Sequence, residues 1–237
     1  MSLVRATRSE GPDHALAMVL AAVAGAANAG GFFALQQYTS HMTGYLSVLA
    51  DTLAIANFWP AFVSCLAISA FITGAGFSAV LINWAREHRS HHQYSLPIAV
   101  QGVLLFCFSF GWVFTSEAGR LFSIACLCFI MGLQNATITK LSGARIRTTH
   151  ATGMVTDIGI EFGRAFYGLW RRASGVHADR KKLGILLSLV GAFLIGGIVG
   201  ALGYKALGFL FSLPLAAILL GISLPYLLFD RPDSVEP

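Results

Sequence analysis

The chain has 237 residues, of which 56% are hydrophobic and only 11% charged, with a formal net charge of +5. Soluble domains usually carry about 25% charged residues, so this composition excludes an ordinary water-soluble fold. Several apolar runs approach twenty residues, the length of a bilayer-spanning helix, and indicate an integral membrane protein. The positive charge then marks cytoplasmic loops rather than a nucleic-acid surface.

Six segments are apolar enough to span a bilayer, at about residues 15–35, 60–84, 96–115, 121–139, 183–204 and 207–229. Two further segments, 42–57 and 151–169, are less apolar. If these two do not cross, every Lys and Arg except Arg120 and Lys205 lies on one side of the membrane. Because basic residues concentrate in cytoplasmic loops, the sequence predicts six spans with both termini in the cytoplasm.

A short polar motif occurs twice, as SHMTG at 40–44 after the first span and as THATG at 149–153 after the fourth. These two spans run in opposite directions, so the motif approaches the bilayer from opposite sides. The sequence therefore predicts an all-α membrane protein with six transmembrane helices plus two re-entrant or broken half-helices, arranged as two inverted-topology repeats. The repeats cover 15–115 and 121–229, between cytoplasmic tails at 1–14 and 230–237.

Each half-helix is predicted to begin at its motif, near the middle of the bilayer. Irregular backbone at that depth must be buried in protein or line a wet cavity. Ser and Thr of both motifs are suitable N-caps, and their glycines permit close backbone approach. The residues concerned are Ser40, Thr43, Gly44, Thr149, Thr152 and Gly153.

Three stretches carry a resemblance to a known family: GAANAGGFFAL, SHMTGYLSVLA and GLQNATITKLSGARIRTTHATGMVTDIG. They resemble the YoaK-like family of bacterial multi-spanning membrane proteins, over about residues 15 to 229, and the second motif block is the more specific part. The resemblance implies about six spans and a bacterial inner (cytoplasmic) membrane. The family has no assigned function, so no substrate or activity is implied.

The duplicated motif is the strongest candidate for a solute-binding site. Its histidines can bind a solute or relay protons, since His titrates near neutral pH; the alternative is a structural His bonded to a backbone carbonyl. The predicted substrate-contacting residues are His41, Thr43, Gly44, His150, Thr152, Gly153, Asn28, Asn135 and Gln134. Small residues four apart surround both asparagines, which predicts close packing of spans 1 and 4 against each other.

Acidic residues occur in both half-helix segments. Asp51 and Asp157 are candidates for proton or ion coupling, because an ionisable group within a membrane is a functional hypothesis by default. Glu161 and Arg164 are expected instead to form a solvent-exposed ion pair that contributes little to stability.

Basic residues precede and follow the second half-helix. Lys140, Arg145 and Arg147 are either a positive-inside signal or a cationic mouth that attracts anions toward the helix N-termini. The basic loop at 171–182 is expected to contact anionic lipid. No cofactor or metal site is expected, because the cysteines lie in apolar runs and HRSHH lacks a second ligand cluster.

These features predict a transporter or channel for a small polar solute, with a lean toward an anion or a carboxylate-bearing solute and with proton coupling as an option. One alternative is a non-transporting scaffold or sensor, in which the repeated polar residues bury against each other without a cavity. A less favoured one is an intramembrane enzyme, for which no nucleophile or metal motif is present. No nucleic-acid partner is expected, and the GxxxG at Gly196 and Gly200 is compatible with a homodimer.

Overall fold

The computed structural model describes residues 10–88, 93–111, 116–141, 151–171 and 175–229, and in these ranges all of the regular secondary structure is helical. Its elements are α1 (Glu10–Leu35), α2 (Met42–Ala54), α3 (Phe58–His88), α4 (Ser95–Phe108), α5 (Glu117–Leu141), α6 (Ala151–Trp170), α7 (Arg180–Leu207), a 3-10 turn (Gly208–Phe211) and α8 (Ser212–Phe229). The six predicted spans coincide with α1, α3, α4, α5, α7 and α8, and the predicted half-helices coincide with α2 and α6.

Four stretches of the described chain are long and apolar enough to cross a membrane: His14–Phe33, Phe58–His88, Glu117–Lys140 and Arg180–Leu228. The last runs through α7, the 3-10 turn and α8. Helix α4 is apolar but has 14 residues, about 21 Å of helix against about 30 Å of hydrocarbon. Length and composition thus support a membrane protein with four candidate spans, fewer than the six predicted.

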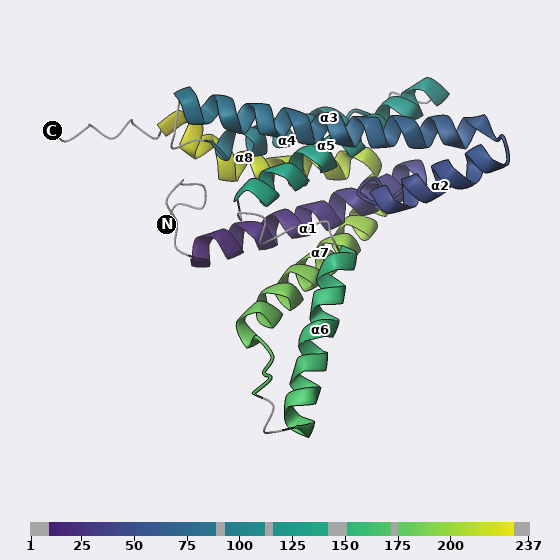
Figure 1. Cartoon of the computed structure of the whole chain (residues 1–237). Coiled ribbons are helices and arrows are strands. Elements are labelled where there is room, and N and C mark those ends of the chain that lie inside the picture. The colour runs from purple at the N-terminus through teal and green to yellow at the C-terminus, as the bar shows by residue number, and fades with distance from the viewer. Residues whose placement is uncertain (1–9, 89–92, 112–115, 142–150, 172–174, 230–237) are drawn as a thin grey trace.

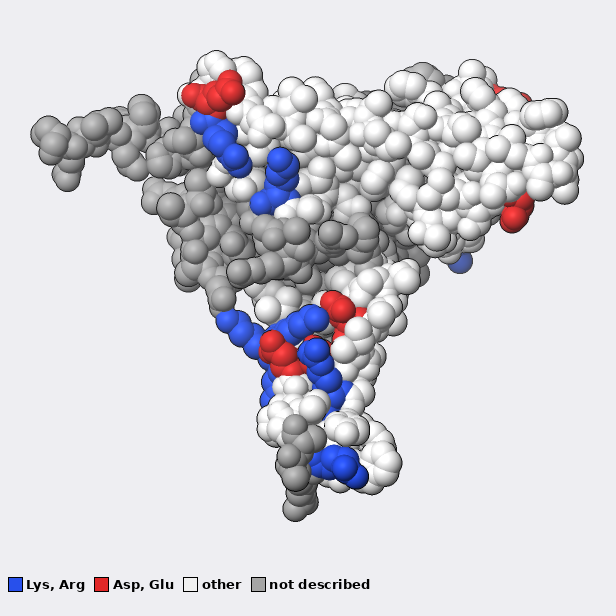
Figure 2. All heavy atoms as spheres, in the orientation of Figure 1, with Lys and Arg blue, Asp and Glu red and all other residues white. Residues whose placement is uncertain are grey.

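Helices α1, α3, α4, α5 and α8 lie lengthwise beside one another, whereas α6 and the first part of α7 extend away from them as a hairpin (Figure 1). The main packing partners are α1 with α7, α3 with α5, and α4 with α8. Helix α1 begins and α8 ends at the same end of the bundle. The face of the bundle seen in Figure 2 is almost free of charge along its length, and blue side chains gather near that end and on the hairpin.

Glycines lie at two close helix crossings. A Cβ added to Gly25 of α1 would overlap the backbone carbonyl of Phe193 on α7, and one added to Gly132 of α5 would overlap that of Phe71 on α3. The glycine stripes therefore face α7 and α3. Spans 1 and 4, which were expected to pack closely on each other, do contact each other as α1 and α5, but their glycines lie against α7 and α3 instead.

The GxxxG of α7 lies at the same crossing. A Cβ on Gly196 would overlap the backbone of Ala22 on α1, and one on Gly200 would overlap Ala26. Both glycines are buried within the chain. This sequence is therefore occupied by an internal contact and gives no support to a homodimer through α7.

The starts of α4 and α8 repeat a sequence that the motif analysis missed, Ser-Leu-Pro at 95–97 and again at 212–214. Proline is tolerated there because the first turn of a helix needs no partner for its N–H groups. Ser95 and Ser212 are both fully buried, and the Ser212 hydroxyl shares a 2.7 Å hydrogen bond with the Tyr204 hydroxyl at the end of α7. Gly208, with a φ of 58°, ends α7 and turns the chain into α8.

Candidate functional site

The first motif is held against the helix that precedes it. After α1, Gln36 adopts a φ of 57° and the chain turns back. It packs over Gly31, where a Cβ would clash with the Thr39 side chain. The backbone N–H and the hydroxyl of Ser40 then both donate to Oδ1 of Asn28, at 3.1 and 2.9 Å. The loop is thereby fixed on the side of α1.

This attachment determines how deep α2 begins. Asn28 lies seven residues before Leu35, the last residue of α1, which is about 10 Å along a helix. It also lies inside the candidate span His14–Phe33. The motif and the start of α2 therefore lie alongside this span rather than beyond its end.

The start of α2 differs from the expected cap. His41 occupies the N-cap position and makes no side-chain cap hydrogen bond. Ser40 does not cap because its hydroxyl is bound to Asn28, and Thr43 lies inside the first turn; the capping prediction for this motif is therefore wrong. The glycine of the motif has a clear role, since a Cβ on Gly44 would overlap the imidazole ring of His41.

A cavity of about 520 Å³ lies where the two motifs meet. We call it the central cavity; it is lined by Asn28, Tyr38, Ser40, His41, Met42, Thr43, Phe71, Asn135, Ala151, Thr152 and Phe193. Helices α1 and α5 each contribute an asparagine, α3 and α7 each a phenylalanine, and α2 and α6 each their first two residues. From this point α2 and α6 leave in different directions (Figure 1).

The polar groups of the central cavity are mostly neutral. Asn135 is 9% exposed, and its Oδ1 atom has no hydrogen-bond partner within the described part of the chain, whereas the Oδ1 of Asn28 is taken by Ser40. Two helix starts also face the cavity, and backbone N–H groups at helix starts carry a partial positive charge. The arrangement suits a small polar solute held by hydrogen bonds and flanked by aromatic rings.

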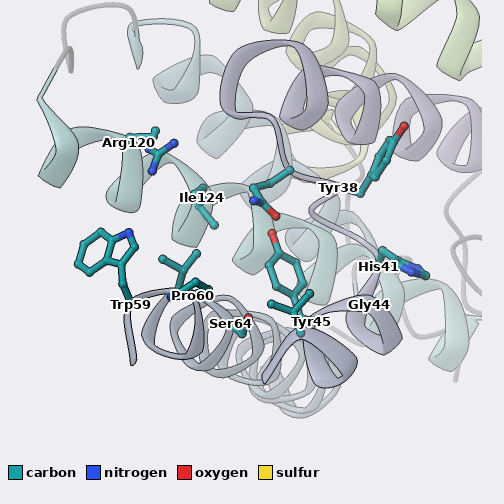
Figure 3. Close-up of a pocket in the computed structure, with 12 residues that line it drawn as sticks. Tyr38, His41, Gly44, Tyr45, Trp59, Pro60, Ser64, Arg120 and Ile124 are labelled. Atoms are coloured by element: carbon teal, nitrogen blue, oxygen red, sulfur yellow. The ribbon is translucent and has the colours of Figure 1, made fainter. Parts of the chain in front are cut away.

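A second cavity, of about 360 Å³, adjoins the first and shares Tyr38 and His41 with it. We call it the side cavity; it is lined by Gln37, Tyr38, His41, Gly44, Tyr45, Val48, Trp59, Pro60, Val63, Ser64, Arg120 and Ile124. Figure 3 shows Arg120 and Trp59 at one end of it, His41 and Gly44 at the other, and Tyr45 between them.

Comparison with known proteins places the chain in a family. The family model DUF1275, described as "Protein of unknown function", matches residues 16–224. The chain belongs to the DUF1275 family. No curated protein and no solved structure matches it. The expectation of a family without an assigned function is confirmed, and the match includes both motifs and both cavities.

Not all the predicted site residues of this DUF1275 chain meet at the central cavity. His41, Thr43, Thr152, Asn28 and Asn135 line it. Of the other described candidates, Gly44 lines the side cavity, Asp51, Lys140 and Gly153 are exposed, and Gln134 and Asp157 line neither cavity. His150, Arg145 and Arg147 lie outside the described residues.

Gln134 is buried away from the central cavity. Its side-chain carbonyl accepts a 2.7 Å hydrogen bond from Nε2 of Gln101 on α4, and its own amide donates to the backbone carbonyl of Leu20 on α1. Gln134 therefore joins α1, α4 and α5. Gln101 was missed, although a single amide in an otherwise apolar helix is itself a signal of an interhelical hydrogen bond.

The acidic residues of α6 bind the start of α7. Glu161 has a fully buried side chain that accepts a hydrogen bond from the backbone N–H of Asp179 at 2.9 Å and pairs with Arg164 at 3.0 Å and Lys182 at 3.7 Å. The expectation of a solvent-exposed ion pair is therefore wrong for Glu161, whose side chain is buried. Asp157 lies 3.4 Å from Lys182 and does not line the central cavity, so both acids act in the hairpin.

Proposed function

We propose that the DUF1275 chain is a multi-pass membrane transporter or channel for a small polar solute, which passes through the central cavity. The observation that carries this proposal is the lining of that cavity by matched residues from both halves of the chain. Asn28 and Asn135 come from α1 and α5, and Phe71 and Phe193 come from α3 and α7. A solute at this point contacts both halves at once, as in transporters with repeated halves.

The same proposal takes the two halves, 15–115 and 121–229, as inverted repeats. Helix pairs support it, because α1 packs on α7 as α5 packs on α3, and α2 packs on α3 as α6 packs on α7. The glycine contacts match as well: Gly25 faces Phe193 as Gly132 faces Phe71. GxxNA and HxTG each occur once per half and in the same order, and Ser-Leu-Pro begins the corresponding helices α4 and α8.

In this arrangement α1, α3, α4, α5, α7 and α8 are six spans, and α2 and α6 are re-entrant helices that start within the bilayer. Both chain ends lie in the cytoplasm of a bacterium, and the membrane is its inner membrane. The start of α1 and the end of α8 lie at one end of the bundle. Arg86 in the last turn of α3 and Lys140 in the last turn of α5 are basic residues near that end. The Arg86 side chain donates to Gln93, and the Tyr94 hydroxyl donates to the backbone carbonyl of Lys140. Basic residues at this end agree with the rule that positive charge concentrates on the cytoplasmic side.

The solute class follows from the lining. The first turns of α2 and α6 favour an anionic or carboxylate group. Asn135 has an unused acceptor that favours a solute with an N–H or O–H donor. A volume of about 520 Å³ lies in the range of pockets that hold small organic ligands. A scaffold or sensor would instead require the repeated polar residues to pack against each other, which the cavity between them disfavours.

The experiment uses the full chain in detergent and in proteoliposomes. A thermal-shift screen of small carboxylates, inorganic anions and amino acids identifies a stabilising solute, and uptake of that solute is then measured. Asn135→Ala and His41→Ala should weaken binding by roughly two- to tenfold, the effect of one hydrogen bond. Asn83→Ala, at an exposed position of α3 away from both cavities, is the matched control. Unchanged uptake in both cavity variants would contradict the site.

A further inference from the structure

The side cavity contains a cation that the central cavity lacks. Arg120 is the one Lys or Arg among the described residues that line either cavity. Its side chain is 48% exposed, and its guanidinium lies 3.7 Å from the carboxylate of Glu117, whose side chain is 64% exposed. A pair of that separation at an exposed site is weak. The guanidinium therefore keeps most of its capacity to bind another anion.

A buried polar atom inside the side cavity also lacks a partner. Tyr45 is 5% exposed, and its hydroxyl makes no hydrogen bond of ordinary geometry with the described residues. It lies beside the Cys128 thiol, which is only a weak hydrogen-bonding group. In Figure 3 the Tyr45 side chain stands between Arg120 at one end and His41 at the other. Buried hydroxyls are normally satisfied, so this one is suited to a bound solute or water.

The two cavities meet at two side chains. Tyr38 and His41 line both. The Tyr38 ring is held by stacking on Phe32, with ring centroids 4.9 Å apart, and the His41 ring occupies the space left by Gly44. These two rings therefore stand where the two cavities adjoin.

We propose that the side cavity is the vestibule by which the solute reaches the central cavity, with Arg120 holding its anionic group and Tyr38 and His41 forming the boundary between the two sites. This rests on the proposed function and narrows the solute to one that carries an anionic group. Arg120 lies in the first turn of α5, at the opposite end of that helix from Lys140. The vestibule therefore opens at the end of the bundle away from the cytoplasmic end proposed above. A single cation in a cavity with low-dielectric walls raises the local concentration of anions.

The test measures access to the side cavity directly. The four native cysteines, Cys65, Cys107, Cys126 and Cys128, are replaced by alanine, and Ser64→Cys is introduced, since Ser64 is a buried lining residue. The thiol forms a mixed disulfide with a methanethiosulfonate reagent and releases methanesulfinate. Rates are compared for an anionic (sulfonatoethyl), a cationic (trimethylammonioethyl) and a neutral (methyl) reagent, on the full chain in proteoliposomes.

The expected result is that the anionic reagent reacts faster than the cationic one and that Arg120→Gln lowers this ratio roughly fivefold. A unit charge roughly 8 Å from the thiol in water attracts the anionic reagent and repels the cationic one, and the two effects together change the ratio of their rates by about this factor. Arg120→Lys should keep the ratio. Lys205→Gln removes an equal charge from an exposed position outside both cavities and should leave it unchanged.

Two outcomes would overturn the vestibule: an unchanged ratio in Arg120→Gln, or no reaction of Ser64→Cys even with the neutral reagent. Folding of each variant is checked by its thermal melt, and Arg120→Met removes the same charge if the Gln variant unfolds. The readout is independent of uptake. If the ratio of reagent rates depended on Arg120 but no solute were transported, the side cavity would remain an anion-attracting entrance and the transport proposal would be rejected.

Discussion

The backbone carbonyl of Phe193 on α7 occupies the space that a side chain on Gly25 of α1 would need. The carbonyl of Phe71 on α3 stands in the same relation to Gly132 of α5. These contacts bring together the helix pairs that carry the cavity-lining residues Asn28, Phe193, Asn135 and Phe71. The geometry of the central cavity therefore depends on the absence of a Cβ at two positions.

Gly25→Ala and Gly132→Ala should each destabilise the protein by about 1–3 kcal/mol, because a methyl group forced against backbone must move a helix. The measurement is the thermal unfolding midpoint in detergent. Gly76→Ala on α3 is the control, since a Cβ there meets none of the described atoms within 4 Å. There the helix propensity of alanine should leave stability equal or up to about 1 kcal/mol higher. Equal effects at all three glycines would contradict the close crossings.

The helices themselves were predictable from the sequence. Runs of apolar residues separated by charged or Gly-containing loops located α1, α3, α4, α5, α7 and α8, although α4 ends at Phe108 rather than 115 and α8 begins at Ser212 rather than 207. The recurrence of His-x-Thr-Gly correctly located the starts of α2 and α6. The partners of the glycine stripes were not predictable, because small residues at Gly25 and Gly132 indicate a close approach without specifying which helix approaches.

The detailed contacts failed where a residue had a competing partner distant in sequence. Ser40 was expected to cap α2, but Asn28, twelve residues earlier, takes both its donors. Glu161 was expected to be solvent-exposed at the membrane interface in a pair with Arg164. Its other partners, Asp179 and Lys182, come from the N-cap and first turn of the next helix. Local spacing contains no information about such contacts.

Glu161 should be more important for stability than its neighbour Asp157. Glu161→Gln keeps the size of the side chain but removes the charge from a fully buried group with three partners. The loss of charged hydrogen bonds should cost about 1.5–3 kcal/mol. Asp157→Asn breaks one 3.4 Å pair between half-exposed groups and should cost less than about 1 kcal/mol. Thermal melts of both variants test this, and a larger loss in Asp157→Asn would reject the assignment.

The buried amide pair Gln101 and Gln134 should show non-additive substitutions. Gln134→Leu alone leaves the buried Gln101 amide without its acceptor, at a cost of about 1–3 kcal/mol. The double variant Gln101→Leu with Gln134→Leu removes both partners, so it should be closer to the parent protein than the sum of the single changes. The four melting curves of this cycle provide the measurement, and strict additivity would show that the two amides do not interact.

The attachment of the first motif to α1 should also appear in a double-mutant cycle. Asn28→Ala removes the acceptor and Ser40→Ala removes one of its two donors, so each change should lower stability and the second should have little effect after the first. A coupling of about 0.5–1.5 kcal/mol is expected, the worth of one hydrogen bond. Asn135→Ala is the matched change on α5. Because the Oδ1 of Asn135 has no partner among the described residues, this variant should melt near the parent temperature while it weakens solute binding. If Asn135→Ala destabilised the empty protein as much as Asn28→Ala, Asn135 would be a structural anchor and its place in the solute site would have to be given up.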